Sequence, residues 1–226
     1  MKQTPIHDGY NPDLLKAIPG NAKRVIEVGC SSGALAKAYR AINPSCEYVG
    51  TEIEPRYAEI ARQHCNQVIE GDIEQMLDEI FSTHKPFDCW IFGDVLEHLY
   101  DPWLVLRRIA RESLGSNATV VACIPNMQHW SIQLRLNRGD LRYQDAGLLD
   151  KTHIRWFTRL TILEMFQTSG YKINEMGGRV FDEPERERIL PMIRSMAKAT
   201  GADPNQAAID ATPLQWIVKA TTLSPE

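Results

Sequence analysis

Residues 24–33 read RVIEVGCSSG and carry the strongest structural signal in the chain. The apolar run at 25–28 predicts a buried strand, and residues 34–39 (ALAKAY) predict a helix that begins directly after Gly33. A strand, a tight turn of small residues and a helix together open a nucleotide-binding α/β unit. Gly29 permits backbone angles that other residues resist, and the start of the helix offers free N–H groups with partial positive charge. We therefore expect a nucleotide-type ligand at this turn.

Strands and helices alternate five times over roughly the first 125 residues. The expected strands cover residues 25–28, 48–51, 67–69, 87–92, 118–124, 171–176 and 214–220. Continuous apolar runs such as 118–124 are typical of strands that are buried on both faces. The pattern predicts an α/β fold, a doubly wound, mostly parallel seven-stranded Rossmann-like sheet with an antiparallel edge strand. The loops after the first five strands should face one site, because ligands bind at the carboxyl ends of such strands.

The composition is that of an ordinary globular domain. The 226 residues are 43% hydrophobic and 24% charged, with a net charge of −4, so the basic surplus of a nucleic-acid-binding protein is missing. The five cysteines are widely spaced without a C-x-x-C pair, and we expect them to be reduced. No apolar run approaches the ~20 residues of a membrane span, and the polar residues 1–12 lack a signal-peptide core. We predict one cytoplasmic domain spanning residues 1–226.

Two nucleotide cofactors compete for the turn after the first strand. The NAD fingerprint is G-x-G-x-x-G/A, and here Ser31 occupies the middle glycine position, although Ala34 could serve as the third. The middle glycine gives a pyrophosphate its close approach to the backbone. The match to NAD is therefore weak.

The turn and two later strand ends resemble the class I S-adenosylmethionine-dependent methyltransferases. The first motif of that family is acidic-x-Gly-x-Gly-x-Gly, which corresponds to EVGCSSG at residues 27–33. Glu52 ends the second strand, 52 − 33 = 19 residues beyond Gly33, and matches the acidic residue that grips both ribose hydroxyls in the family. Asp72 resembles the third-strand aspartate that meets the adenine amino group. We expect Glu27 to help hold the positively charged end of the ligand.

The resemblance implies that S-adenosylmethionine is the cofactor and S-adenosylhomocysteine the product. The residues that it assigns to cofactor binding are Glu27, Gly29, Cys30, Ser31, Gly33, Glu52, Ile53, Asp72, Ile73, Gly93 and Asp94.

The fourth expected strand is followed by a histidine. Residues 87–99 read FDCWIFGDVLEHL and resemble the signature of small-molecule members of the family. His98 would face the substrate and could accept a proton from a hydroxyl or an amine, or could instead be a structural histidine. The spacing of Asp94, Glu97 and His98 would place them on one face of a helical turn. We assign no metal to them, and whether a divalent metal binds near these three residues stays open.

A segment at about 126–157 is predicted to form a lid over the substrate. Residues 124–130 (IPNMQHW) and 143–158 (YQDAGLLDKTHIRWFT) resemble a bacterial subgroup that often accompanies glycan or secondary-metabolite pathways. His153 is the preferred catalytic candidate in this lid. The candidate substrate contacts are Asn126, His129 and Arg155. For His153 and Arg155 a purely structural role in the lid stays open.

The sequence predicts a methyltransferase that acts on a small-molecule or saccharide acceptor, with O-methylation expected. N-methylation of an amino-sugar or another small amine stays open, as do an NAD-dependent oxidoreductase and a catalytically silent methyltransferase-like binding subunit. A helical insert at about 183–211 could shape the substrate pocket or form a homodimer contact.

Overall fold

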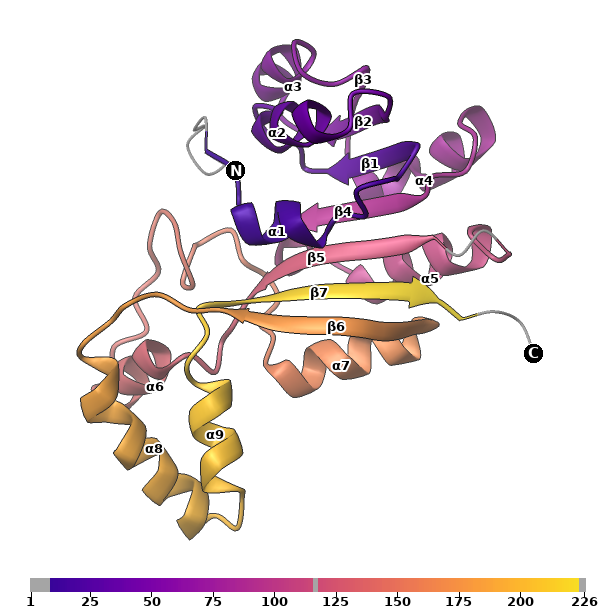
Figure 1. Ribbon diagram of the computed structural model, residues 1–226. Helices are drawn as coiled ribbons and strands as arrows, with labels where there is room; N and C mark the ends of the chain where they lie inside the picture. The colour runs from indigo at the N-terminus through magenta and orange to yellow at the C-terminus, as the bar shows by residue number, and fades with distance from the viewer. Residues whose placement is uncertain (1–8, 116–117, 224–226) are drawn as a thin grey trace.

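The apolar runs of the chain pair into one sheet in the computed structural model, which describes residues 9–115 and 118–223 (Figure 1). The predicted polar segment at 1–12 therefore lies mostly outside the described residues. The strand order is β3-β2-β1-β4-β5-β7-β6. The strands are β1 (Arg24–Val28), β2 (Glu47–Glu52), β3 (Gln67–Glu70), β4 (Cys89–Gly93), β5 (Thr119–Pro125), β6 (Tyr171–Arg179) and β7 (Gln215–Thr222).

The sheet is parallel except for β7, which pairs antiparallel with both β5 and β6. This confirms the predicted mostly parallel seven-stranded sheet with an antiparallel edge strand, in that β7 and β6 form an antiparallel pair at one edge. The outermost strand is β6, and β7 fills the place between it and β5. The connection through α7 (Arg159–Thr168) places β6 one strand position away from β5. The last strand of the chain, β7, then enters the position between them.

The strand order reverses between β1 and β4. The chain leaves β1 toward β2 and β3 on one side, and it returns to β4 on the other side of β1. Ligands of doubly wound sheets bind at such a switch point, outside the carboxyl ends of the strands. The loops that follow β1 and β4 are therefore the first place to look for a site.

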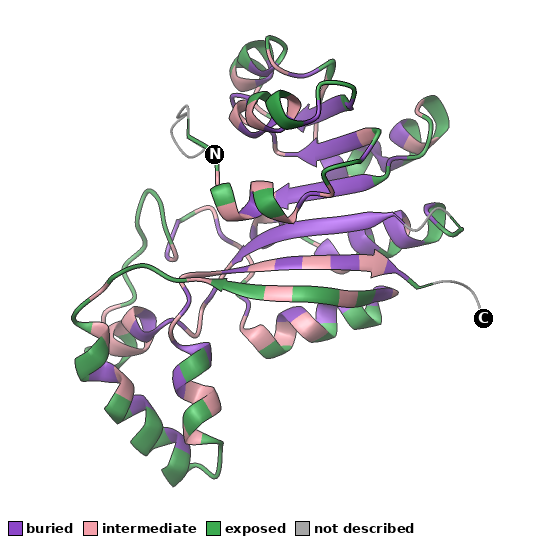
Figure 2. Cartoon of the chain, in the orientation of Figure 1, coloured by how far each residue is buried: buried purple, intermediate pink, exposed green. Residues whose placement is uncertain are grey.

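Helices cover both faces of the sheet and enclose two apolar clusters. One face carries α1 (Pro12–Ala17), α2 (Ala34–Ile42) and α3 (Pro55–Ala61), and the other carries α4 (Ile73–Thr83), α5 (Pro102–Glu112) and α7. The central strands between them are almost wholly buried (Figure 2). Side chains cap two of these helices: Asn11 accepts hydrogen bonds from two N–H groups of α1, and Thr158 forms a capping box with Thr161 at α7.

Two helices stand apart from the sheet as a helical arm, formed by α8 (Arg186–Ala199) and α9 (Pro204–Asp210). The arm extends away from the sheet together with α6 (Trp130–Asn137) and is mostly exposed (Figures 1 and 2). A small apolar cluster of its own joins the three helices through Trp130, Ile189, Ile193 and Ala211. The predicted helical insert is thus a separate layer rather than a further cover of the sheet.

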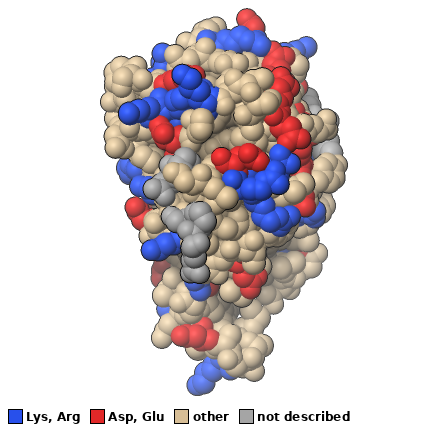
Figure 3. All heavy atoms as spheres, turned by 90° about the vertical axis from the view of Figure 1, so that its right-hand side faces the viewer, with Lys and Arg blue, Asp and Glu red and all other residues tan. Residues whose placement is uncertain are grey.

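The surface is of mixed charge. Figure 3 shows lysines and arginines interspersed with aspartates and glutamates on the face seen from the right of Figure 1, as is typical of a solvated surface. Among the residues that the structure describes, no helix combines the length and apolarity that crossing a membrane requires.

Candidate active site

The loop after β1, residues 29–33, is built from left-handed backbone. Gly29, Ser31 and Gly33 have φ values of 68°, 48° and 75°. A Cβ atom on Gly29 would lie 2.7 Å from Cγ2 of Val95, so only glycine fits this position without displacement. The N–H of Cys30 donates to the carbonyl of Thr51 at 2.9 Å and fixes the loop to the end of β2. We call these five residues the first-strand loop.

Glu52 ties the first-strand loop to the next strand end. Its side chain is buried, and its two carboxylate oxygens accept the N–H groups of Ser31 at 2.8 Å and Glu54 at 2.9 Å. A carboxylate oxygen can accept two hydrogen bonds, so each oxygen retains a position for a further donor. Ile53 follows with an apolar side chain that is 53% exposed. Glu52 thus offers acceptors for two neighbouring hydroxyls, and Ile53 offers an exposed apolar surface beside them.

Glu27 lies beneath the first-strand loop in a buried position. The hydroxyl of Tyr48 donates to its carboxylate at 2.9 Å. Burial, with the nearby thiol of Cys65 as a smaller cause, raises the pKa of the Glu27 carboxyl well above its usual value. No ion pair of Glu27 forms within the described part of the chain. A cationic ligand group above it would stabilise the ionised carboxylate.

Two predicted cofactor residues turn their side chains into the core. Cys30 is 3% exposed, and a Cβ atom on Gly50 would lie 2.5 Å from its sulfur. Ile73 is the first residue of α4 and belongs to the larger apolar cluster. Only the main chain of these two residues can face a ligand.

Three further predicted residues lie at the ends of β3 and β4. Asp72 caps α4 by accepting the N–H of Glu74 at 2.9 Å, while its side chain remains partly exposed. Gly93 is the last residue of β4. Asp94 follows with a left-handed φ of 56° and accepts a hydrogen bond from the side chain of Gln215.

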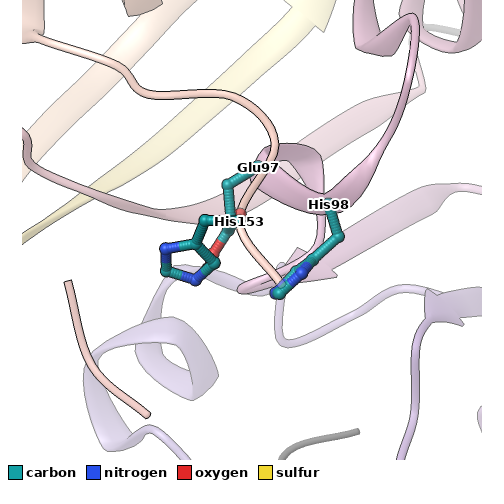
Figure 4. A group of neighbouring side chains, drawn as sticks. All are labelled: Glu97, His98 and His153. Atoms are coloured by element: carbon teal, nitrogen blue, oxygen red, sulfur yellow. The ribbon is translucent and has the colours of Figure 1, made fainter. Parts of the chain in front are cut away.

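A second group of polar side chains lies after β4, and we call it the histidine cluster: Glu97, His98 and His153 (Figure 4). Glu97 and His98 come from the 3-10 turn η1 (Leu96–His98), and His153 comes from the lid. The two imidazole rings are edge to face with centroids 4.8 Å apart. Nε2 of His153 is 3.9 Å from Oε1 of Glu97.

The lid is fastened to this turn by its main chain. The N–H groups of Ile154 and Arg155 both donate to the carbonyl of Glu97 at 3.0 Å. Farther along the lid, the N–H of Met127 donates to the carbonyl of Phe157 at 2.8 Å. Backbone hydrogen bonds therefore hold His153 against η1, in addition to the contact between the two imidazole rings.

Hydrogen bonds to carbonyl oxygens fix the protonation of both rings. Nδ1 of His98 lies 3.1 Å from the carbonyl of Thr152, and Nδ1 of His153 lies 3.3 Å from the carbonyl of Leu148. A carbonyl only accepts, so each Nδ1 carries the hydrogen and each Nε2 carries the lone pair. Burial lowers the pKa of both imidazoles, so they are neutral near pH 7.

The spacing argument for Asp94, Glu97 and His98 holds only in part. Asp94 precedes the 3-10 turn and is exposed, and it is not among the side chains whose ligand atoms come together with those of Glu97 and His98. His153 takes the third place instead, 153 − 97 = 56 residues beyond Glu97. No local pattern links the two positions, and sequence reasoning therefore missed this contact.

The side chains of the three predicted substrate contacts bond to other parts of the chain. Asn126 is fully buried, and its amide donates to the carbonyls of Asp210 at 2.7 Å and Pro213 at 2.8 Å, below the helical arm. His129 is 1% exposed and caps α6, with Nε2 3.3 Å from Glu183.

Arg155 belongs to the lid. Its guanidinium donates to the carbonyl of Tyr100. These placements favour roles in holding the lid and the arm, and a direct substrate contact stays an untested prediction for all three residues.

Comparisons with known proteins agree with this geometry. A family model described as a methyltransferase domain matches residues 8–175. No curated protein matches the chain. An S-adenosylmethionine-dependent methyltransferase from Mesorhizobium loti is 14% identical with a TM-score of 0.59, over 93% of this chain and 96% of that one.

Two other similar structures were crystallised with ligands. Magnesium protoporphyrin IX methyltransferase from Synechocystis PCC 6803, with bound S-adenosylhomocysteine, is 14% identical with a TM-score of 0.54, over 88% of this chain and 74% of that one. An O-methyltransferase from neocarzinostatin biosynthesis, in complex with S-adenosylhomocysteine and 1,4-dihydroxy-2-naphthoic acid, is 14% identical with a TM-score of 0.54, over 93% and 52%. At this identity the likeness establishes the fold.

Proposed function

The chain belongs to the class I S-adenosylmethionine-dependent methyltransferases, and from this membership we propose that it methylates a hydroxyl group of a small-molecule or saccharide acceptor. The interpretation as an NAD-dependent oxidoreductase does not agree with the membership. The observation that carries the proposal is Glu52, whose buried carboxylate joins the first-strand loop to the end of β2 and keeps acceptor positions on both oxygens.

The residues of the first-strand loop fit S-adenosylmethionine. Glu52 would accept the two ribose hydroxyls, and the exposed Ile53 would lie against the adenine, whose amino group Asp72 would meet. Glu27 would lie beside the cationic amino-acid end, whose positive charge would favour ionisation of this carboxyl group against the burial that raises its pKa. Gly29, Ser31 and Gly33 would present their main chain to the ligand, as would Cys30 and Ile73, and Gly93 and Asp94 would border its methionine part.

The bound cofactor supplies an electrophilic methyl group on a sulfonium. The chain has to align the acceptor, exclude water and remove a proton. His98 and His153 are the proposed catalytic residues: their Nε2 lone pairs point to a role in taking the hydroxyl proton as the oxygen acquires the methyl group. Water is kept out by the lid, whose main chain is bonded to η1.

O-methylation is favoured over N-methylation by the histidine cluster. A hydroxyl must lose its proton to become a good nucleophile, whereas a neutral amine is already nucleophilic, so a paired imidazole site suits oxygen.

We further propose that residues 1–226 form one methyltransferase domain with a lid at about 126–157 and an insert at about 183–211. The exposed Met192 and Met196 on α8 make the insert a candidate homodimer contact. All five cysteines are free and buried, which suits a reducing cytoplasm.

Calorimetry with S-adenosylhomocysteine and with NADH tests the cofactor part of the proposal. We expect binding of S-adenosylhomocysteine with 1:1 stoichiometry and no binding of NADH. Binding of neither ligand would contradict the proposal and favour a silent subunit.

The acceptor part is tested by presenting phenolic, sugar and amino-sugar acceptors with labelled S-adenosylmethionine. We expect label on oxygen, and loss of turnover in His98→Ala and His153→Ala with S-adenosylhomocysteine affinity retained. Unchanged turnover in both variants would remove the histidines from the mechanism.

A further inference from the structure

Glu97 is a buried carboxylate of the site without a hydrogen-bond partner. It is 1% exposed, and neither of its carboxylate oxygens finds a donor among the residues that the structure describes. A buried carboxylate without a partner is costly, because it has lost its hydration and gained nothing in return. Burial correspondingly raises the pKa of its carboxyl group. A carboxylate in this situation points to a ligand that supplies the missing positive charge.

The two histidines beside Glu97 are oriented as metal ligands usually are. In metal sites the non-ligating ring nitrogen donates to a carbonyl or carboxylate, which fixes the tautomer and the ring. Nδ1 of His98 and Nδ1 of His153 make these contacts with the carbonyls of Thr152 and Leu148. The peptide of Thr152 is itself held, because its N–H and hydroxyl both donate to Asp150 at 2.8 and 2.7 Å.

The ligand atoms lie close enough to share one ion. One atom from each of Glu97, His98 and His153 lies within 4.8 Å of the other two, and Figure 4 shows the Glu97 carboxylate directed toward the rings. Nε2 of His153 is 3.9 Å from Oε1 of Glu97, whereas two ligands of a tetrahedral zinc ion are about 3.4 Å apart. This difference of about half an ångström is small enough for side-chain rotations to close.

We propose that Glu97, His98 and His153 bind a single divalent transition-metal ion of the zinc, manganese or iron(II) class. Two imidazoles with one carboxylate suit these ions, whereas magnesium and calcium prefer oxygen ligands. Three protein ligands leave coordination positions open, and the partly exposed His98 marks the side from which a further ligand can enter. The sequence assigned no metal to Asp94, Glu97 and His98 and left the question open, and it did not point to His153 as a third ligand.

The proposal rests on the proposed function, since it deepens the role of the same histidines. In the metal-bound protein both Nε2 atoms would serve as ligands, so the two histidines would act through the ion instead of taking the hydroxyl proton themselves. The ion would lower the pKa of an acceptor hydroxyl, and the proton would pass to water on the partly exposed side of His98.

The test uses the full-length protein, freed of metal with a chelator and titrated separately with Zn²⁺, Mn²⁺ and Mg²⁺ by calorimetry. Co²⁺ serves as a spectroscopic probe of imidazole ligation. We expect one Zn²⁺ or Mn²⁺ per chain, bound more tightly than Mg²⁺. In Glu97→Gln, His98→Ala and His153→Ala the affinity should fall by more than the roughly 10- to 100-fold that the loss of an outer-shell partner costs.

His84→Asn is the matched control, because His84 lies outside the cluster, at the end of α4. It should bind the metal as the natural protein does. Absence of 1:1 binding, a preference for Mg²⁺, or affinity unchanged in all three cluster variants would overturn the proposal.

S-adenosylhomocysteine binding by the same samples separates the two proposals. We expect it to be retained in all three cluster variants, which also shows that they fold. Metal binding without S-adenosylhomocysteine binding would refute the proposed function alone. S-adenosylhomocysteine binding without metal binding would refute the metal site alone.

Discussion

The first-strand loop and the histidine cluster lie at the same edge of the sheet but are built in different ways. The first-strand loop is held by groups at the ends of two neighbouring strands: Ser31 reaches Glu52, and Cys30 reaches Thr51. The histidine cluster joins η1 to a lid segment 56 residues farther along the chain, since 153 − 97 = 56. The first depends on strand pairing, and the second depends on how the lid closes.

This difference separates two kinds of functional residue. A loop that is fixed by adjacent strands of a pleated sheet is rigid once the sheet forms, and it suits a ligand common to a whole family. The histidine cluster is completed by a long connection, whose residues can change without disturbing the sheet. Such a site suits the methyl acceptor, which differs from one member of the family to another. We therefore expect substitutions in the two regions to have separable effects.

Glu52→Ala should have the largest effect and should be confined to the cofactor side. It removes the acceptors for two ribose hydroxyls and for the N–H groups of Ser31 and Glu54. Hydrogen bonds to a charged group are worth about 1.5–3 kcal/mol each, so the affinity for S-adenosylhomocysteine should fall by about 100-fold or more. Calorimetry measures this.

Glu54→Ala is the control for Glu52→Ala, because only its main chain bonds to Glu52. Equal losses in the two variants would contradict the role of the Glu52 carboxylate. Loss of metal binding in Glu52→Ala would break the separation between the two regions.

Asn126→Ala tests whether that residue holds the helical arm or contacts the substrate. It leaves the carbonyls of Asp210 and Pro213 without their buried donor, which should lower the free energy of unfolding by about 2–4 kcal/mol. Urea denaturation measures the change. Asn137→Ala, which removes an exposed amide bonded to Gln133, should cost less than about 0.5 kcal/mol. A stable Asn126→Ala protein with a raised KM would instead assign the residue to the substrate.

Gly29→Ala separates backbone strain from crowding in the first-strand loop. Its new Cβ meets Val95 at 2.7 Å, whereas Gly139 has a similar φ of 69° and nothing within 4 Å. Gly139→Ala should therefore cost about 1–2 kcal/mol of backbone strain, and Gly29→Ala should cost about 1–3 kcal/mol more. Adding Val95→Ala to Gly29→Ala should recover part of the loss. Equal unfolding midpoints for the two glycine variants would rule out the crowding.

Glu27→Gln should have the smallest effect, and its sign depends on pH. The folded-state pKa of Glu27 is raised above its usual 4.5, so between these values the folded state holds one more proton than the unfolded state. The contribution of this group to stability is complete below about pH 4.5 and is lost as pH rises through the folded-state pKa. Glutamine does not titrate, so the free energy of unfolding of the variant should increase relative to that of the natural protein as pH rises.

Melting curves at pH 5 and pH 8 measure this gain. We expect a Tm for Glu27→Gln about 2–4 °C above that of the natural protein at pH 8, which is about 1 kcal/mol at this size, and a smaller difference at pH 5. S-adenosylhomocysteine should bind more weakly to the variant. A variant that is less stable at both pH values would show that the carboxylate has a compensating partner.

The sequence predicted most of the fold because its signals are local. Apolar runs identified the strands, and the caps at Asn11 and Thr158 are equally local, because each side chain bonds to N–H groups two or three residues away. The position of β7 inside the edge of the sheet was not predicted, since apolar alternation does not say which strand pairs with which.

The candidate site was predicted unevenly for the same reason. Glu27, Gly29, Ser31 and Glu52 follow from strand ends, and the structure brings them together. The resemblance suggested substrate contacts at Asn126 and His129, but both side chains are buried under the helical arm, a layer that no local pattern placed there.

The sequence by itself determined the class of fold, the family and the first-strand loop. Backbone conformation and the burial of each strand depend on neighbouring residues, so their rules can be applied along the chain. Only the tertiary structure decided that Glu97 and His153 meet and that the amide of Asn126 donates to the carbonyl of Asp210 in the arm. These contacts depend on the closure of long connections, whose free energy is set by packing across the whole domain rather than by any short stretch.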